Sequence, residues 1–119
     1  MMASHNEKGI RGEKIAADYL RRKGYKIIRQ NWRYHPKEVD LIAYDGEELV
    51  IVEVKLRSTD YFGDPSEAVT LKKQQYLIQA AEAFLETLED EPEVRFDIVS
   101  IISDNSDHTI EHVTDAFNP

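Results

Sequence analysis

The chain has 119 residues, of which 41% are hydrophobic, 9% aromatic and 32% charged, and its formal net charge is −8. This length and composition suit one globular domain over residues 1–119 and exclude a disordered tail, while the absence of cysteine excludes disulfides and thiolate metal sites. No run reaches the ~20 apolar residues of a membrane span, and the start lacks the apolar middle of a secretory signal, so we expect a cytoplasmic protein without a membrane partner.

The first part of the chain predicts a helix followed by a strand. Apolar residues recur at helical spacing between residues 9 and 22, and Gly24 follows where a left-handed residue often ends a helix. Residues 25–34 are rich in side chains that favour β structure and should form the first strand. We expect a loop at Pro36, because proline cannot donate to the hydrogen bonds of a sheet.

The rest of the chain predicts four strands and a second helix. Asp45-Gly46-Glu47 is a strong hairpin signal between two apolar runs, and residues 103–108 form a second polar turn. Residues 58–67 resemble a loop, and an apolar stripe at helical spacing follows Pro65. The expected elements are strands over 38–44 and 48–57, a helix over 66–88, and strands over 94–102 and 109–113. The fold class is therefore α/β, in the order α-β-β-β-α-β-β.

Charged residues interrupt the apolar run that should form the third strand, although charged side chains are rarely buried without compensation. Side chains alternate across a strand, so Glu53 and Lys55 share one face. If Gly46-Glu47 is the turn, the register places Asp40 directly opposite Glu53. If Asp45-Gly46 is the turn, Asp40 lies diagonal to Glu53 on the same face. Either register brings the two carboxylates together.

Two carboxylates on one half-buried face repel each other unless a proton or a cation lies between them. Mg²⁺ is commonly held by one or two carboxylates together with water and phosphate oxygens. Asp40 and Glu53 therefore predict a site for Mg²⁺ or Mn²⁺, and Lys55 could stabilise charge on a phosphate or orient the attacking water. This chemistry is phosphodiester hydrolysis. The alternative is that Lys55 forms an ordinary ion pair with Glu53, or with Glu38, which faces it in the first register.

These residues match the pattern of PD-(D/E)XK nucleases, an aspartate followed by a hairpin and then Glu-x-Lys, with Val39 here in place of the usual proline. Over residues 9–117 the chain resembles the YraN family, also called UPF0102. The resemblance rests on several blocks in order, "GEKIAADYLRRKGYKIIRQNWR", "EVDLIAYDGEELVIVEVKLRS", "FGDPSEAVTLKKQQYL", "RFDIVSI" and "IEHVTDAF".

The resemblance implies a restriction-endonuclease-like core, with a mixed central sheet between helices, similar to that of Holliday-junction resolvases. It implies that Glu13 is a further catalytic residue, although Glu13 lies on the polar side of its helix and solvation explains it equally well. It also implies supporting roles for Glu38 and Gln74, while Lys37 stands where the family usually has glycine. Resolvase-like enzymes cut two strands as twofold dimers, so a homodimer is expected.

The distribution of charge favours a nucleic-acid partner more than the total does. A net charge of −8 argues against phosphate binding, yet residues 1–37 hold ten basic and three acidic side chains. Such asymmetry can direct a polyanion to one face, although a solvated basic helix is the alternative. We identify Arg33, Lys72 and Lys73 as candidate phosphate contacts, and Arg57 as a supporting residue on the face of the predicted metal ligands.

Three other residues carry weaker signals. Trp32 could stack on a base, but we expect it to pack in the core. His108 and His112 share a strand face unless a bulge intervenes, and we expect both to be exposed. The sequence contains no glycine-rich phosphate loop, nucleophile elbow or zinc-ligand spacing.

Three functions are compatible with this sequence. The first is a Mg²⁺- or Mn²⁺-dependent endonuclease acting on DNA, including branched or single-stranded DNA. The second is a nucleic-acid-binding module that keeps the nuclease fold without effective cleavage, serving DNA repair, recombination or uptake. The third is a scaffold that binds another protein through the acidic second helix and residues 85–93.

Overall fold

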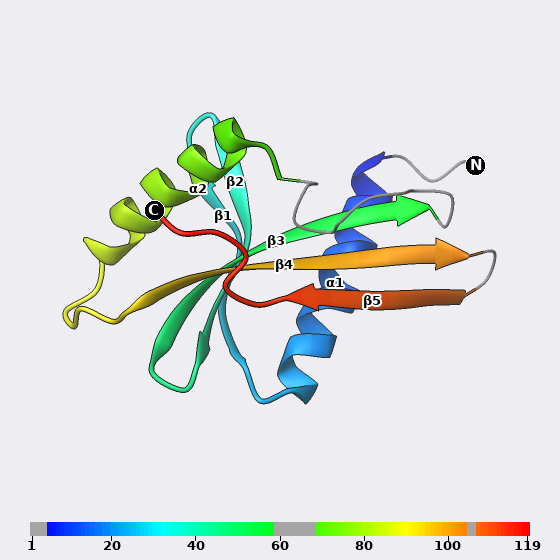
Figure 1. The fold of residues 1–119 in the computed structure, drawn as a ribbon, viewed down its shortest axis with the longest axis horizontal. Helices are drawn as coiled ribbons and strands as arrows, with labels where there is room; N and C mark the ends of the chain where they lie inside the picture. Colours follow the sequence, from blue (N-terminus) through cyan, green and yellow to red (C-terminus); the bar gives the residue numbers. More distant parts are fainter. Residues whose placement is uncertain (1–4, 59–68, 105–106) are drawn as a thin grey trace.

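The computed structural model describes residues 5–58, 69–104 and 107–119 (Figure 1), with side chains from Arg11 onward except that of Asp104. The described residues form two helices and five strands in the predicted order α-β-β-β-α-β-β, which confirms the fold class. The elements are α1 (His5–Arg22), β1 (Lys26–Tyr34), β2 (Lys37–Asp45), β3 (Glu48–Ser58), α2 (Leu71–Leu85), β4 (Val94–Asp104) and β5 (Asp107–Val113).

The strands form one mixed sheet in the order β1-β2-β3-β4-β5. The β3–β4 pair is parallel, and the other three pairs are antiparallel. A parallel pair needs a crossover connection, and α2 lies in the connection between β3 and β4. The sheet is strongly twisted, so that the β1–β2 hairpin runs across the direction of β4 and β5 in Figure 1.

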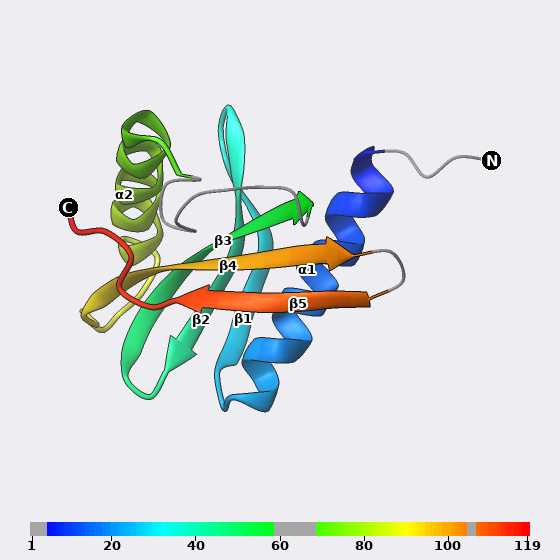
Figure 2. The ribbon, with the colours of Figure 1, turned by 45° about the vertical axis from the view of Figure 1, so that its right-hand side comes forward.

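The two helices cover opposite faces of the sheet (Figure 2). On β3, Val50 and Val52 belong to the apolar core under α1, whereas Leu49 and Ile51 belong to the core under α2. This alternation follows from the period of two in a strand. The third strand is therefore apolar on both faces, which explains why its sequence is a nearly continuous apolar run.

The first helix ends as the sequence predicts. Gly24 has φ +96°, its N–H donates to the Arg21 carbonyl at 2.9 Å, and the Tyr25 N–H donates to the Leu20 carbonyl at 2.9 Å. This pair of bonds is a Schellman motif, which glycine permits because it lacks a Cβ. The helix begins at His5, four residues earlier than the apolar spacing indicates.

The second helix is shorter than predicted. It runs from Leu71 to Leu85 instead of 66–88, and residues 66–68 lie outside the described part of the chain. Thr70 is the N-cap, and its Oγ1 accepts from the Lys73 N–H at 3.1 Å. Apolar periodicity missed this start because Val69 is buried without being helical.

The last two strands extend further toward each other than predicted. Their pairing continues without a bulge from Ile98↔Val113 to Asp104↔Asp107, so most of the expected polar turn is strand. The regular register also confirms that His108 and His112 share a face.

Candidate active site

The β2–β3 hairpin adopts the first of the two predicted registers. Asp45 pairs with Glu48 across the turn, Gly46 has φ +61°, and the regular pairing continues to Leu41↔Val52. Leu41 is the last residue of β2 that pairs with β3, and Asp40 is its neighbour on the side away from the turn. Asp40 therefore lies at the point where the pairing of β2 with β3 ends.

Asp40 is held at this separation by a backbone contact. Its Oδ2 accepts a hydrogen bond from the Val54 N–H at 2.8 Å. The carboxylate thus bonds a β3 amide just beyond the last paired residues, Leu41 and Val52. Since Val54 directly follows Glu53, this bond fixes Asp40 beside the glutamate.

Glu53 is almost completely buried, with 3% of the residue exposed. Its Oε2 contacts two ammonium groups, Lys55 Nζ at 3.4 Å and Lys73 Nζ at 3.6 Å. Among the described residues, its Oε1 is buried and has no hydrogen-bond partner. Buried carboxylate oxygens normally have partners, so this oxygen is placed to accept a proton or a cation. The ordinary ion pair of Lys55 with Glu53 is present, but it involves only Oε2.

The two carboxylates do not both carry a full charge in the absence of a cation. Burial, the charge of Glu53 and a side-chain hydrogen bond with Glu53 raise the pKa of Asp40 to about 8, against the opposing bond from Val54. The charge of Glu13 on α1 raises this pKa further, so Glu13 acts on Asp40 electrostatically. A proton therefore occupies the space between the carboxylates at neutral pH.

This donor set fits a hard divalent cation. Asp40 and Glu53 offer carboxylate oxygens, one of them without a partner, and a cation would replace the shared proton. Within the described ranges, no three His, Cys, Asp or Glu side chains converge closely enough to hold a metal ion by themselves. Two protein carboxylates with water and substrate oxygens are the usual arrangement for Mg²⁺.

The other predicted residues are divided between this site and other parts of the surface. Lys73 reaches Glu53 from α2, whereas Lys72 is exposed. Gln74 donates from Nε2 to the Val69 carbonyl at 3.1 Å and so stabilises the start of α2. Arg57 lines a pocket next to α1.

Extrapolating the hairpin register to Glu38 was wrong, because the β2–β3 pairing stops before it. Glu38 instead pairs with Arg33 across β1 and β2, in an exposed ion pair of 3.8 Å. Trp32 packs in the core as expected, and the centroids of the Trp32 and Phe84 rings lie 5.1 Å apart in an edge-to-face contact.

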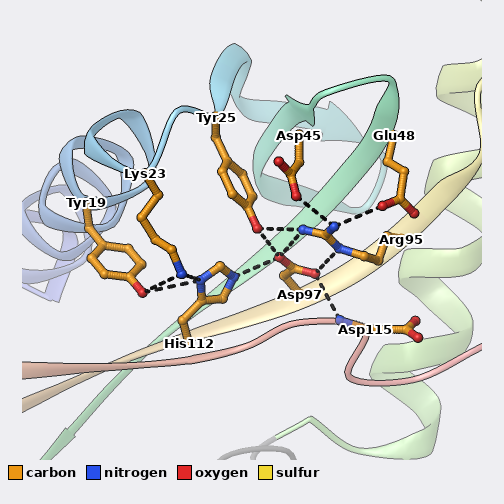
Figure 3. A network of polar contacts seen from close by, with 9 residues as sticks. All are labelled: Tyr19, Lys23, Tyr25, Asp45, Glu48, Arg95, Asp97, His112 and Asp115. Carbon is orange, nitrogen blue, oxygen red and sulfur yellow. Dashed lines mark hydrogen bonds and ion pairs between the residues drawn. The ribbon is translucent and has the colours of Figure 1, made fainter.

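Sequence reasoning missed a second set of polar residues, which surrounds Asp97 on the α1 face (Figure 3). Asp97 is 1% exposed and accepts hydrogen bonds from Tyr25, Arg95 and the backbone of Asp115, and its Oδ2 lies 2.7 Å from Nε2 of His112. Burial alone would raise the pKa of Asp97, but the bonds with His112, Arg95 and Asp115 outweigh it and lower the pKa to about 2. The cluster ties α1, β4, β5 and the C-terminal segment together.

The expectation that His112 is exposed was wrong, since 3% of its side chain is exposed. Arg95 also bonds Asp45 and Glu48, the pair that closes the β2–β3 turn. A signal was present in the sequence, because Arg95 and Asp97 alternate within an apolar strand as Glu53 and Lys55 do. This cluster stabilises the turn end of the hairpin, several residues along the strands from Asp40.

Comparison with known proteins agrees with the geometry. The family model described as "Uncharacterised protein family UPF0102" matches residues 12–101. The chain belongs to the UPF0102 family. A UPF0102 protein of Christiangramia forsetii is 47% identical over 98% of both chains, and one of Phocaeicola vulgatus is 43% identical over 99% of this chain and 98% of its own. A UPF0102 protein of Chlorobium limicola is 47% identical over 92% of this chain and 90% of its own.

The UPF0102 match confirms the family that the sequence blocks indicate. The matched span contains Asp40, Glu53, Lys55 and Lys73, together with Asp97. Neither helix of this UPF0102 protein, as far as the structure describes them, is long and apolar enough to cross a membrane.

Proposed function

We propose that this UPF0102 protein is a metal-dependent endonuclease that hydrolyses phosphodiester bonds in DNA. The observation that carries the proposal is a buried pair of carboxylates, Asp40 and Glu53, that share one proton at neutral pH. Lys55 and Lys73 contact only Oε2 of Glu53, so neither ammonium group reaches its buried Oε1. Mg²⁺ or Mn²⁺ held by Asp40 and Glu53 would replace the shared proton and satisfy this oxygen.

Each residue then has a chemical role. The metal, when bound, makes a water molecule more acidic and neutralises charge on the phosphate. Lys55, whose side chain is 35% exposed, is accessible to orient the attacking water or to stabilise the developing negative charge. Lys73 holds Glu53 from the α2 side. Glu13 adds negative charge near Asp40 and so favours a cation there.

A nucleic-acid-binding module without cleavage is the second candidate. It is favoured by the ion pairs of Lys55 and Lys73, which hold both ammonium groups on Glu53 in the metal-free protein. In this case the same surface would bind DNA in a repair, recombination or uptake complex.

The deciding experiment incubates the protein with labelled duplex, single-stranded and four-way-junction DNA in Mg²⁺, Mn²⁺ or EDTA. Asp40→Asn and Lys55→Ala are compared with Lys72→Ala, which removes an exposed lysine on α2. The nuclease predicts metal-dependent cleavage that Asp40→Asn and Lys55→Ala abolish and Lys72→Ala preserves. Salt-sensitive binding without cleavage supports the module. If the protein neither binds nor cleaves DNA, the protein scaffold is supported.

A twofold dimer is part of the nuclease proposal, because cutting both strands at a junction requires two active sites. Sedimentation of the protein with and without junction DNA would measure the number of chains. If the protein is a monomer in both conditions, the proposed nuclease would cut only one strand in each binding event.

A further inference from the structure

A row of lysine side chains leads from the candidate active site to the closed end of the β1–β2 hairpin. Lys73 Nζ, which lies 3.6 Å from Glu53 Oε2, also lies 5.6 Å from the centre of the Tyr76 ring. Lys37 Nζ lies 5.8 Å from the centre of the same ring. Cations within about 6 Å of an aromatic ring are attracted to its face. Together with Lys55, which contacts the same glutamate, Lys73 and Lys37 form the lysine row.

Tyr76 fixes the far end of the lysine row by joining α2 to the hairpin. Its hydroxyl donates a hydrogen bond to the Tyr34 carbonyl, and the centroids of the two rings lie 5.6 Å apart. Tyr34 packs against the apolar core under α2 and pairs directly with Lys37 across β1 and β2. Directly paired residues share a face, so Lys37 lies on the α2 face of the hairpin. The closed end of this hairpin extends away from β3 and β4 (Figure 2).

The lysine row carries an excess of positive charge, although the whole chain is acidic. Its three ammonium groups face the charge of Glu53, because Asp40 is protonated at neutral pH. Counting Glu13, which acts on Asp40 from α1, still leaves one ammonium group in excess. Arg33 and Glu38 beside the row compensate each other in their ion pair. A polyanion responds to this local charge more than to the total.

We propose that the lysine row binds the backbone of the DNA substrate on one side of the scissile phosphate, with Lys73 and Lys37 at neighbouring phosphates of one strand. Both ammonium groups lie near one ring, so they are at most about 11 Å apart, which is about the rise of three nucleotides. Lys37 is exposed and, among the described residues, has no carboxylate partner. Lysine contacts phosphate as a point charge, so this contact is independent of sequence. The inference rests on the proposed function and specifies the path of the DNA strand.

The first test measures the salt dependence of binding to a short labelled oligothymidylate, by fluorescence anisotropy in EDTA between about 50 and 200 mM salt. Lys37→Ala should reduce the slope of log affinity against log salt by about 0.7, because one phosphate contact to a single strand is lost. Lys37→Arg keeps the charge and should keep the slope of the natural chain. Lys26→Ala removes an exposed lysine at the opposite end of β1 and should leave the slope unchanged.

The second test uses ¹⁵N NMR of the full chain in EDTA with the same oligothymidylate. We expect the amides of Tyr34, Lys37 and Lys73 to shift and that of Lys26 to stay in place. The inference is overturned if the oligothymidylate does not bind or leaves the hairpin amides unshifted. It is also overturned if Lys26→Ala reduces the slope as much as Lys37→Ala, which would place DNA along the basic first part of the chain.

The outcomes for the lysine row and for the nuclease proposal are separable, because cleavage enters neither binding test. If Lys37→Ala reduces the slope but the natural chain does not cleave DNA in Mg²⁺ or Mn²⁺, only the nuclease proposal is overturned. If the natural chain cleaves DNA but Lys37→Ala leaves the slope unchanged, only the inference about the lysine row is overturned.

Discussion

Lys73 Nζ lies 3.6 Å from Glu53 Oε2, so a lysine of α2 pairs with a buried glutamate of β3. Lys55 Nζ reaches the same oxygen at 3.4 Å from within β3. The glutamate side chain is 4% exposed, and these two ammonium groups are its ion-pair partners. The position of α2 is thereby linked to the electrostatics of the candidate metal site.

Lys73→Ala should lower the free energy of unfolding of the metal-free protein by about 1–2 kcal/mol, because Lys55 alone then compensates the buried charge. Lys72→Ala should change it by less than about 0.5 kcal/mol, as for other exposed positions. Urea unfolding at neutral pH in EDTA measures both values. Equal effects of the two substitutions would show that the Lys73–Glu53 ion pair contributes nothing to stability.

Asp40 should make the metal-free protein less stable as the pH rises. Its folded-state pKa is raised from 3.8 to about 8, so its contribution is fully present below about pH 4 and is lost as the pH rises through 8. Asp40→Asn cannot ionise and should therefore be more stable than the natural chain at pH 8, by about 1 kcal/mol or more. Urea unfolding of both proteins at pH 5 and pH 8 in EDTA tests this. Parallel pH profiles would contradict it.

Mg²⁺ or Mn²⁺ should stabilise the natural chain, and EDTA should reverse the effect. A ligand that binds only the folded state at a hundred times its Kd adds about 2.7 kcal/mol to the free energy of unfolding. The increase should be larger at pH 8 than at pH 6, because the cation displaces the proton of Asp40. Thermal unfolding with added metal measures it.

The matched variants for this metal titration are Asp40→Asn and Glu82→Gln. Asp40→Asn should lose most of the stabilisation, since one carboxylate ligand is gone. Glu82 is exposed on α2, and its substitution should leave the metal response intact. A metal response that persists in Asp40→Asn would place the cation elsewhere.

Asp97→Asn should destabilise the protein by about 2–4 kcal/mol at neutral pH, because Arg95 loses its buried partner and the bond with His112 is weakened. The folded-state pKa of Asp97 is lowered to about 2, so its contribution is present above about pH 4 and is lost as the pH falls toward 2. The difference between variant and natural chain should therefore shrink between pH 4 and pH 2. Urea unfolding across this range gives the test, and Asp90→Asn in an exposed loop is the control.

Local patterns in the sequence predicted most of the fold. The alternation of Glu53 and Lys55, and the Asp45-Gly46-Glu47 turn, brought Asp40 to the glutamate without any knowledge of distant contacts. Gly24 likewise identified the end of α1. These features depend on neighbours in the chain, because strand and helix periods and turn conformations are set by the local backbone.

The tertiary structure decided what the local patterns could not. Lys73 reaches Glu53 only because α2 packs on one face of the sheet, and Asp97 meets His112 only because β4 and β5 pair beneath α1. The end of the β2–β3 pairing, which separates Glu38 from Lys55, also has no local signal. Such contacts join residues far apart in the chain, so their distances and burial depend on how whole elements pack. The sequence by itself determined which charged residues lie in the core strands, and packing determined which partners they have.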